Sequence, residues 1–188
     1  MDYGISRARA LDLMKHYITQ PNLRHHSLAA EAVMAKLARH LGADETLWRL
    51  TGLLHDLDAE LTQDDMLRHT HETANILRGE GVAEEIIEAI CLHNEHAHEQ
   101  QRNQPLHHAL AAGETITGLI TATALVYPDK KLASVKPNSV RKRFKEKLFA
   151  AGANREIISE CEKNGISVPD FCDLCLEAMQ EIAPELGL

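Results

Sequence analysis

A histidine followed directly by an aspartate, His55-Asp56, is the feature of this sequence with the clearest chemical potential. The pair ends an apolar run over residues 47–54 and precedes the acidic stretch 57–60. It places one neutral imidazole and one carboxylate at the end of an expected helix. Divalent metals such as manganese, iron, cobalt and zinc accept this mixture of nitrogen and oxygen ligands. A His-Asp pair also occurs by chance, so its meaning depends on the other residues that could join it.

Four further residues could complete a metal site, and each lies within or at the end of its own expected helix: His26, His69, His93 and Glu114. Each also has an ordinary structural explanation. His93 closes the apolar face of residues 86–90, as a buried histidine with a hydrogen-bonded ring would. The small residues around Glu114 suit a carboxylate that reaches inward, and equally suit close helix packing.

Together these segments resemble the HD superfamily of metal-dependent phosphohydrolases, whose signature is a histidine, an adjacent His-Asp pair and a distant aspartate. The matching segments are Arg24-His25-His26-Ser27-Leu28, Gly52-Leu53-Leu54-His55-Asp56-Leu57-Asp58 and Ala111-Ala112-Gly113-Glu114. The resemblance covers residues 20–130 and extends to a subgroup with two more histidines, here His69 and His93. The chain departs from the family at the last ligand, where Glu114 replaces aspartate and carries one more methylene.

The resemblance implies an all-α, HD-domain-like helical bundle that holds one or two divalent metal ions (Mn, Fe, Co, Mg or Zn). The implied metal ligands are His26, His55, Asp56, His69, His93 and Glu114, with Asp56 bridging two ions. The family pattern selects His26 over His25, and His69 over His71. Asp58 could orient a ligating histidine, but we expect it to be a solvated acid in the turn.

The implied function is hydrolysis of a nucleotide or other small phosphate ester, either a monoester or a diester, by a metal-activated water. Asp56, His69 and His93 are the expected catalytic residues. If only one metal binds, the two histidines would contact the phosphate or protonate the leaving group. Two alternatives stay open. The departure at Glu114 favours a metal-binding regulatory module with weak turnover, and some proteins with this ligand order are di-iron oxygenases.

A basic stretch follows the long apolar helix that carries Glu114. Lys130, Lys131 and Arg141 are candidate contacts for a substrate phosphate, since arginine suits bidentate recognition of phosphate. The same residues would also form the cationic outer face of an ordinary surface helix. The four cysteines are expected to be structural, because Cys172 and Cys175 form a CxxC without the second pair that a four-thiolate zinc site needs.

Composition limits the classes of function. The chain has 188 residues, of which 44% are hydrophobic and 26% charged, and this predicts a compact helical protein. The net charge of −8 argues against a general nucleic-acid binder, but a local site can still bind a small anionic substrate. No run reaches the roughly 18 apolar residues of a membrane span, and the N-terminus lacks signal-peptide features. A cytoplasmic location is therefore expected.

Helical periodicity extends along the whole chain. Helices are expected near residues 6–19, 28–41, 45–54, 69–78, 84–95, 105–126 and 138–151, with two more separated by a break at 165–169. Pro21 should end the first helix, Gly42 should end the second and Asp44 should cap the third. We expect residues 1–188 to form one domain, with a metal-binding core at 20–130 and C-terminal helices at 137–188. The other histidines are expected in turns or at the surface: His16, His40, His96, His98, His107 and His108.

Overall fold

The computed structural model describes residues 2–63 and 65–188, and within these ranges it contains helices and no β-strand. The prediction of an all-α protein is confirmed. The α-helices are α1 (Arg7–Tyr17), α2 (Pro21–Leu41), α3 (Glu45–Leu54), α4 (His71–Gly79), α5 (Glu84–His93), α6 (Pro105–Leu125), α7 (Pro137–Lys145), α8 (Arg155–Ile158), α9 (Val168–Glu181) and α10 (Ala183–Leu186). Three short 3₁₀ helices accompany them, at Glu95–Ala97, Leu132–Ser134 and Ser159–Asn164.

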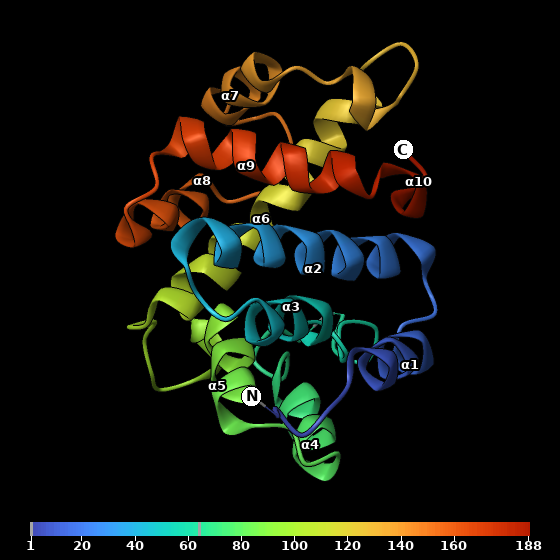
Figure 1. The fold of residues 1–188 in the computed structure, drawn as a ribbon, viewed down its shortest axis with the longest axis vertical. Helices are drawn as coiled ribbons and strands as arrows, with labels where there is room; N and C mark the ends of the chain where they lie inside the picture. The colour runs from blue at the N-terminus through green and yellow to red at the C-terminus, as the bar shows by residue number, and fades with distance from the viewer. Residues whose placement is uncertain (1, 64) are drawn as a thin grey trace.

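Helix α2 lies at the centre of the fold and packs against α3, α6 and α9. Figure 1 shows α9, α2 and α3 as successive layers that run in similar directions, while α6 passes behind them at a steep angle. Helices α4 and α5 lie below α3 in this view, and α7 lies above α9. The hydrophobic core includes residues from all of these layers, from Tyr3 near the N-terminus to Leu186 near the C-terminus. Within the described ranges, no helix combines the length and apolar character needed to cross a bilayer.

The ends of α2 follow local sequence signals. Pro21 is the first residue of α2, where its missing N–H costs no hydrogen bond. The helix therefore begins earlier than expected, and His26 lies in its second turn. At the other end Gly42 adopts a φ of 67° and donates its N–H to the carbonyl of Ala38, which confirms the predicted C-cap.

Helix α3 ends directly before the His-Asp pair. The carboxylate of Asp44 accepts a hydrogen bond from the N–H of Leu47 at 3.0 Å, as predicted for an N-cap, and the last helical residue is Leu54. This helix lies very close to α2 because Gly52 has no side chain. A Cβ atom at Gly52 would lie 2.7 Å from the carbonyl oxygen of Ala30. The close approach brings the His-Asp pair up to the face of α2 that carries His26.

We expect Gly52→Ala to lower the free energy of unfolding by about 1–3 kcal/mol, because the two helix backbones would have to separate. Denaturant unfolding followed by circular dichroism measures this. Gly79→Ala is the matched control, since a Cβ at Gly79 meets no atom within 4 Å. Equal stability of the two variants would contradict the close α2–α3 contact.

The fold differs from the expected helix boundaries at two places that matter for the site. His69 lies in a turn before α4, and Thr70 adopts a φ of 83°, so the helix begins only at His71. Helix α7 ends at Lys145 and does not continue to residue 151. The reason is the guanidinium of Arg155, which donates to the backbone carbonyls of residues 143, 144, 146, 149, 150 and 153. One side chain thus replaces the hydrogen bonds of a longer helix and holds residues 146–154 as a loop.

Candidate metal centre

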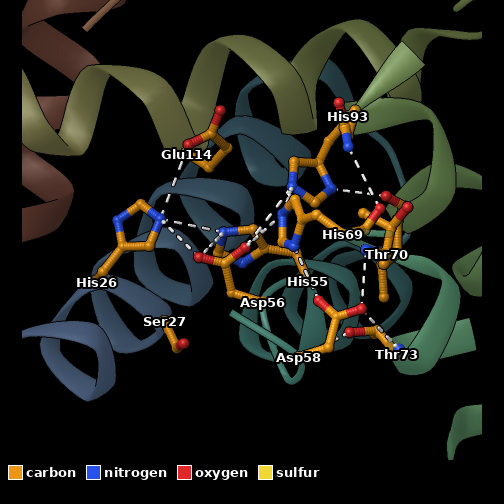
Figure 2. Close-up of polar contacts among 12 residues, drawn as sticks. His26, Ser27, His55, Asp56, Asp58, His69, Thr70, Thr73, His93 and Glu114 are labelled. Carbon is orange, nitrogen blue, oxygen red and sulfur yellow. Dashed lines mark hydrogen bonds and ion pairs between the residues drawn. The ribbon is translucent and has the colours of Figure 1, made fainter. Parts of the chain in front are cut away.

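The six side chains implied by the sequence resemblance come together at one place (Figure 2). Helix α2 contributes one histidine, the turn after α3 contributes the His-Asp pair, and the turn before α4 contributes another histidine. The end of α5 and the middle of α6 complete the group. The residues are His26, His55, Asp56, His69, His93 and Glu114. Their separation along the chain means that tertiary packing alone assembles the site.

The carboxylate of Asp56 lies between two pairs of histidines. Its Oδ2 atom is 3.6 Å from Nε2 of His26 and 3.5 Å from Nε2 of His55. Its Oδ1 atom is 3.3 Å from Nε2 of His69 and 3.6 Å from Nε2 of His93. Within each pair the two Nε2 atoms are 3.1 Å apart. Each carboxylate oxygen of Asp56 therefore faces its own pair of imidazoles.

Glu114 reaches the site from α6 on the side of His26. Its Oε2 atom is 3.7 Å from Nε2 of His26, and its Oε1 atom accepts a hydrogen bond from the hydroxyl of Thr115. The donor atoms of His26, His55 and Glu114 all lie within 4.8 Å of one another. Glutamate is one methylene longer than aspartate, yet Glu114 still places a carboxylate within this group.

Backbone carbonyls fix the orientation of two of the imidazoles. Nδ1 of His55 donates to the carbonyl of Gly52 at 2.8 Å. Nδ1 of His93 donates in the same way to the carbonyl of Ile90 at 2.6 Å. A carbonyl can only accept, so both rings carry their proton on Nδ1 and direct the lone pair of Nε2 into the site.

Side chains fix the other two imidazoles in the same tautomer. The hydroxyl of Thr117 donates to the carbonyl of Glu114 at 2.7 Å and so accepts from Nδ1 of His26 at 2.9 Å. Nδ1 of His69 donates to Oδ1 of Asp58 at 2.8 Å. The neutral forms of all four rings therefore present Nε2 lone pairs to the same space.

This donor set fits a divalent metal. Lone pairs that face each other at 3.1 Å repel unless a proton or a cation lies between them. Imidazole nitrogens anchored through their far nitrogen, combined with carboxylate oxygens, are the ligands of Mn, Fe, Co and Zn in proteins. A second group lies beside the one that includes Glu114. Its donor atoms are also within 4.8 Å of one another, and it consists of His55, Asp56 and His93. The two groups share His55, and either could hold a metal ion.

Asp58 is not the solvated acid that the sequence suggested. Its side chain is fully buried and accepts hydrogen bonds from His69 and from the backbone N–H groups of Thr70 and Thr73, the last two at 2.8 and 3.1 Å respectively. The hydroxyl of Thr73 in turn accepts a hydrogen bond from the backbone N–H of Asp58 at 3.1 Å. Asp58 thus orients His69 and holds the turn in which Thr70 has its positive φ (Figure 2).

The electrostatics of the site keep three of its ligands in the form that binds metal. Burial, together with the neighbouring His55, lowers the pKa of His26 to about 4 and that of His93 to about 3. Burial alone would raise the pKa of Asp56, but the surrounding histidines outweigh it and hold that pKa well below its usual value. At neutral pH these two imidazoles are uncharged and Asp56 is ionised.

Two groups carry a proton when no metal is bound. Burial alone would lower the pKa of His69, but its hydrogen bonds to Asp56 and Asp58 outweigh burial and raise the pKa to about 10. Burial, reinforced by the charge of Asp56, raises the pKa of Glu114 to about 8. Since both values lie above 7, a metal that takes these ligands must displace both protons.

Metal binding at pH 7 is therefore expected to release about two protons from the fully loaded protein. Calorimetric titration of the metal-free protein, in buffers with different enthalpies of ionisation, measures the number released. Glu114→Gln removes one of the two titrating groups and should release about one proton fewer. Identical proton release by the two proteins would mean that Glu114 is not protonated in the metal-free state.

A cavity of about 600 Å³ opens beside these side chains. Met66 and His96 line one part of it, and the loop that Arg155 holds lines another part through residues such as Ala150 and Ala153. His96 is exposed, as expected for a turn, but it belongs to the cavity wall. The C-terminal helices thus contribute to the surroundings of the site, which the periodicity of the sequence did not indicate.

The structure does not bring the predicted phosphate-binding residues to this cavity. Lys130 and Lys131 are exposed and lie beyond the end of α6, and the distance from Glu114 to that end is about 16 Å of helix. Arg141 forms a bidentate ion pair with Asp173 of α9. Lys130 and Lys131 are far from the metal ligands because α6 carries the chain away from the site.

The expectation that His107 and His108 lie at the surface is wrong. Both are buried, and Nδ1 of His108 contacts the carboxylate of Glu160 at 2.6 Å. Glu160 also binds Arg102, whose guanidinium donates to the carbonyl of His93 at 3.3 Å. This buried network connects the C-terminal helices to the end of α5. The apolar neighbours of the two histidines in the sequence were the available signal.

The cysteines have the structural character that the sequence favoured. All four are free, and Cys161, Cys172 and Cys175 are buried. Burial raises the pKa of Cys161 and of Cys172 to about 12 and also raises that of Cys175. They are therefore neutral thiols at neutral pH.

Comparison with known proteins identifies the family of this chain. A family model described as the HD domain matches residues 23–122. The chain is 27% identical over 164 residues to a Ribonuclease Y from a Sulfurovum species, covering 86% of this chain and 32% of that protein. It is 26% identical over 139 residues to a Ribonuclease Y from a Nitratiruptor species, covering 72% of this chain and 26% of that protein. The chain thus spans a third or less of these curated relatives. No solved structure matches it.

Proposed function

Because this chain belongs to the HD domain family, we propose that it is a metal-dependent phosphohydrolase that acts on a small phosphate ester. The observation that carries the proposal is the set of four inward Nε2 lone pairs around the carboxylate of Asp56. A metal ion would stabilise this arrangement by accepting these lone pairs, and the cavity beside it leaves room for a substrate. Its volume is within the range of about 300–1,000 Å³ that is usual for small-molecule sites, which accommodates a nucleotide.

His26, His55 and Glu114 would hold one ion and His69 and His93 the other, with Asp56 placed between the two histidine pairs to serve both. Divalent Mn, Fe, Co, Mg or Zn would supply Lewis acidity and lower the pKa of water toward neutrality. Asp58 keeps His69 directed toward Asp56 through its contact with Nδ1. If only one ion is present, His69 and His93 would instead be free to contact the phosphate or to protonate the leaving-group oxygen.

The position of Glu114 supports a working hydrolase over a weak regulatory module. A carboxylate that had lost its role through the change from aspartate would not need to lie in the site, yet Oε2 is 3.7 Å from Nε2 of His26. The name of the relatives, Ribonuclease Y, indicates RNA cleavage for those proteins. For this chain we propose a smaller substrate, because its net charge is −8 and long nucleic acids are bound largely through basic side chains.

The test is metal content followed by an activity survey. Protein purified without chelator or affinity tag is expected to hold about two metal ions per chain. After reconstitution with each of Mn, Fe, Co, Mg and Zn, a panel of phosphate monoesters and diesters should reveal turnover with at least one metal. Metal-replete protein that cleaves none of them would refute the hydrolase and favour the regulatory module. Bound iron with substrate-dependent oxygen consumption would instead indicate the oxygenase.

A further inference from the structure

A second hollow, which we call the α2–α6 groove, is lined in part by His26. It has a volume of about 350 Å³ and lies between α2, α6 and the C-terminal residues. Its walls are mainly apolar, and the side chains that make them so are Ala29, Ala122, Leu125, Leu186 and Leu188. Neither the family match nor the proposed function assigns a role to it.

The α2–α6 groove and the cavity meet at the metal centre. His26 and Gly118 line both of them. Gly118 lies four residues after Glu114 in α6, so the two positions share one face of the helix, one turn apart. A molecule held at the metal centre can therefore extend in two directions, into the cavity and past Gly118 into the groove.

Gly118 keeps this passage open although the helix would be more stable with another residue. Glycine in a helix interior is less favourable than alanine by about 0.5–1 kcal/mol. Gly113, in the same helix, is explained by packing, because a Cβ there would lie 3.2 Å from Val33. A Cβ at Gly118 would meet no atom within 4 Å. Neither packing nor backbone conformation requires this glycine, which is exposed and lines both hollows.

The charge of the two hollows restricts what can fill them. Among the residues that the structure describes, no lysine or arginine lines either one. A phosphate bound at the metal centre would have the metals as partners, but a second phosphate in either hollow would have no lysine or arginine to pair with. The hollows therefore favour a ligand whose parts away from the metals are uncharged.

We propose that the α2–α6 groove holds an uncharged, apolar substituent of a phosphodiester whose other substituent occupies the cavity. This inference rests on the proposed hydrolase and narrows its substrate from a phosphate ester to a small diester with a single phosphate. In the reaction a water oxygen bonds to phosphorus and the bond from phosphorus to one ester oxygen breaks. The departing oxygen takes up a proton, and the products are a phosphate monoester and an alcohol. A polynucleotide would place further phosphates in hollows that no lysine or arginine lines.

The first test closes the passage with Gly118→Leu in manganese-loaded protein. Calorimetry measures binding of diphenyl phosphate, the diester probe, and phenyl phosphate, the monoester probe. We expect Gly118→Leu to lower the affinity for diphenyl phosphate by at least about tenfold and the affinity for phenyl phosphate by less than about threefold. Gly118→Ala adds only one methyl group and should weaken binding of diphenyl phosphate by less than Gly118→Leu does. Circular dichroism and metal content check that the variants fold and load as the wild type does.

The second test alters the groove at a distance from the metals. Leu125 lines the α2–α6 groove, while its neighbour Val126 does not, and both are exposed at the end of α6. Leu125→Asp introduces a negative charge into the groove and should lower the affinity for diphenyl phosphate several-fold, without changing the affinity for phenyl phosphate. Val126→Asp adds the same charge outside the groove and should change neither affinity.

The outcomes separate this inference from the proposed function. If Gly118→Leu and Leu125→Asp both weaken binding of diphenyl phosphate but not of phenyl phosphate, the groove is supported as a subsite. That conclusion holds even if the protein hydrolyses no ester, a result that would refute the proposed function. If Gly118→Leu weakens binding of both probes equally, or weakens binding of neither, the subsite is overturned. The proposed hydrolase is not affected by either result. Wild-type protein that binds no diphenyl phosphate also overturns the subsite.

Discussion

Asp56→Asn is expected to lose both metal ions and to lower phosphohydrolase activity by at least about a thousandfold. The two oxygens of Asp56 face different histidine pairs, at 3.3–3.6 Å from the four Nε2 atoms. No other carboxylate among the described residues contacts both pairs, so the loss of its charge weakens both metal positions together. Asparagine keeps the size of the side chain, which limits the change to charge and ligand strength.

Elemental analysis and turnover measured on the same preparations check this prediction. Asp65→Asn is the matched control, because Asp65 is exposed in the neighbouring turn and its carboxylate accepts from the backbone N–H of Leu67. The control should keep its metals and its activity. Asp56→Asn protein that retains two ions and cleaves substrate within about tenfold of the wild-type rate would rule out the bridging role.

Asp58→Ala is expected to lower the free energy of unfolding by about 3–5 kcal/mol, because it removes one partner of a buried ion pair. The substitution leaves Nδ1 of His69 and the N–H groups of Thr70 and Thr73 without their acceptor. It also releases the turn in which Thr70 holds a φ of 83°. Metal affinity should fall as well, since His69 loses the contact that directs its Nε2 atom toward Asp56.

The pH dependence of this loss gives a sharper measurement on metal-free protein. Burial alone would raise the pKa of Asp58, but hydrogen bonds from His69 and Thr73 outweigh burial and lower that pKa. The contribution of Asp58 is therefore present above its unfolded pKa of about 3.9 and is lost as the pH falls through the lower folded value. The pKa of His69 is raised to about 10, so its contribution is complete below about pH 6.5 and is lost as the pH rises through 10.

The stability difference between wild type and Asp58→Ala should therefore be largest between about pH 4 and 6.5 and should decrease toward pH 10. Urea unfolding in the presence of a chelator, at a series of pH values, measures it. Asp12→Ala, an exposed aspartate on α1, is the control and should show a small difference at every pH. A difference for Asp58→Ala that does not change with pH would mean that the pair with His69 is not charged in the folded protein.

The sequence predicts the helices well where their ends depend on neighbouring residues. Asp44 caps α3 through an N–H three residues away, and Gly42 ends α2 through a carbonyl four residues away. Such contacts form within one turn of helix and need no other part of the chain. It predicts less well where a distant side chain decides the outcome. Arg155 ends α7 by binding carbonyls up to twelve residues earlier, which no helical periodicity could indicate.

By itself the sequence determined an all-α chain, the caps of α2 and α3, and, through its motifs, which histidines and carboxylates to examine. Only the tertiary structure decided how those residues are used. Burial depends on which helices pack together, and it turned Asp58 from a surface acid into the partner of His69. The direction of α6 likewise placed Lys130 outside the site and Gly118 beside it. Motifs report the chemical types of residues, whereas their protonation, orientation and access to substrate depend on neighbours that are distant in the chain.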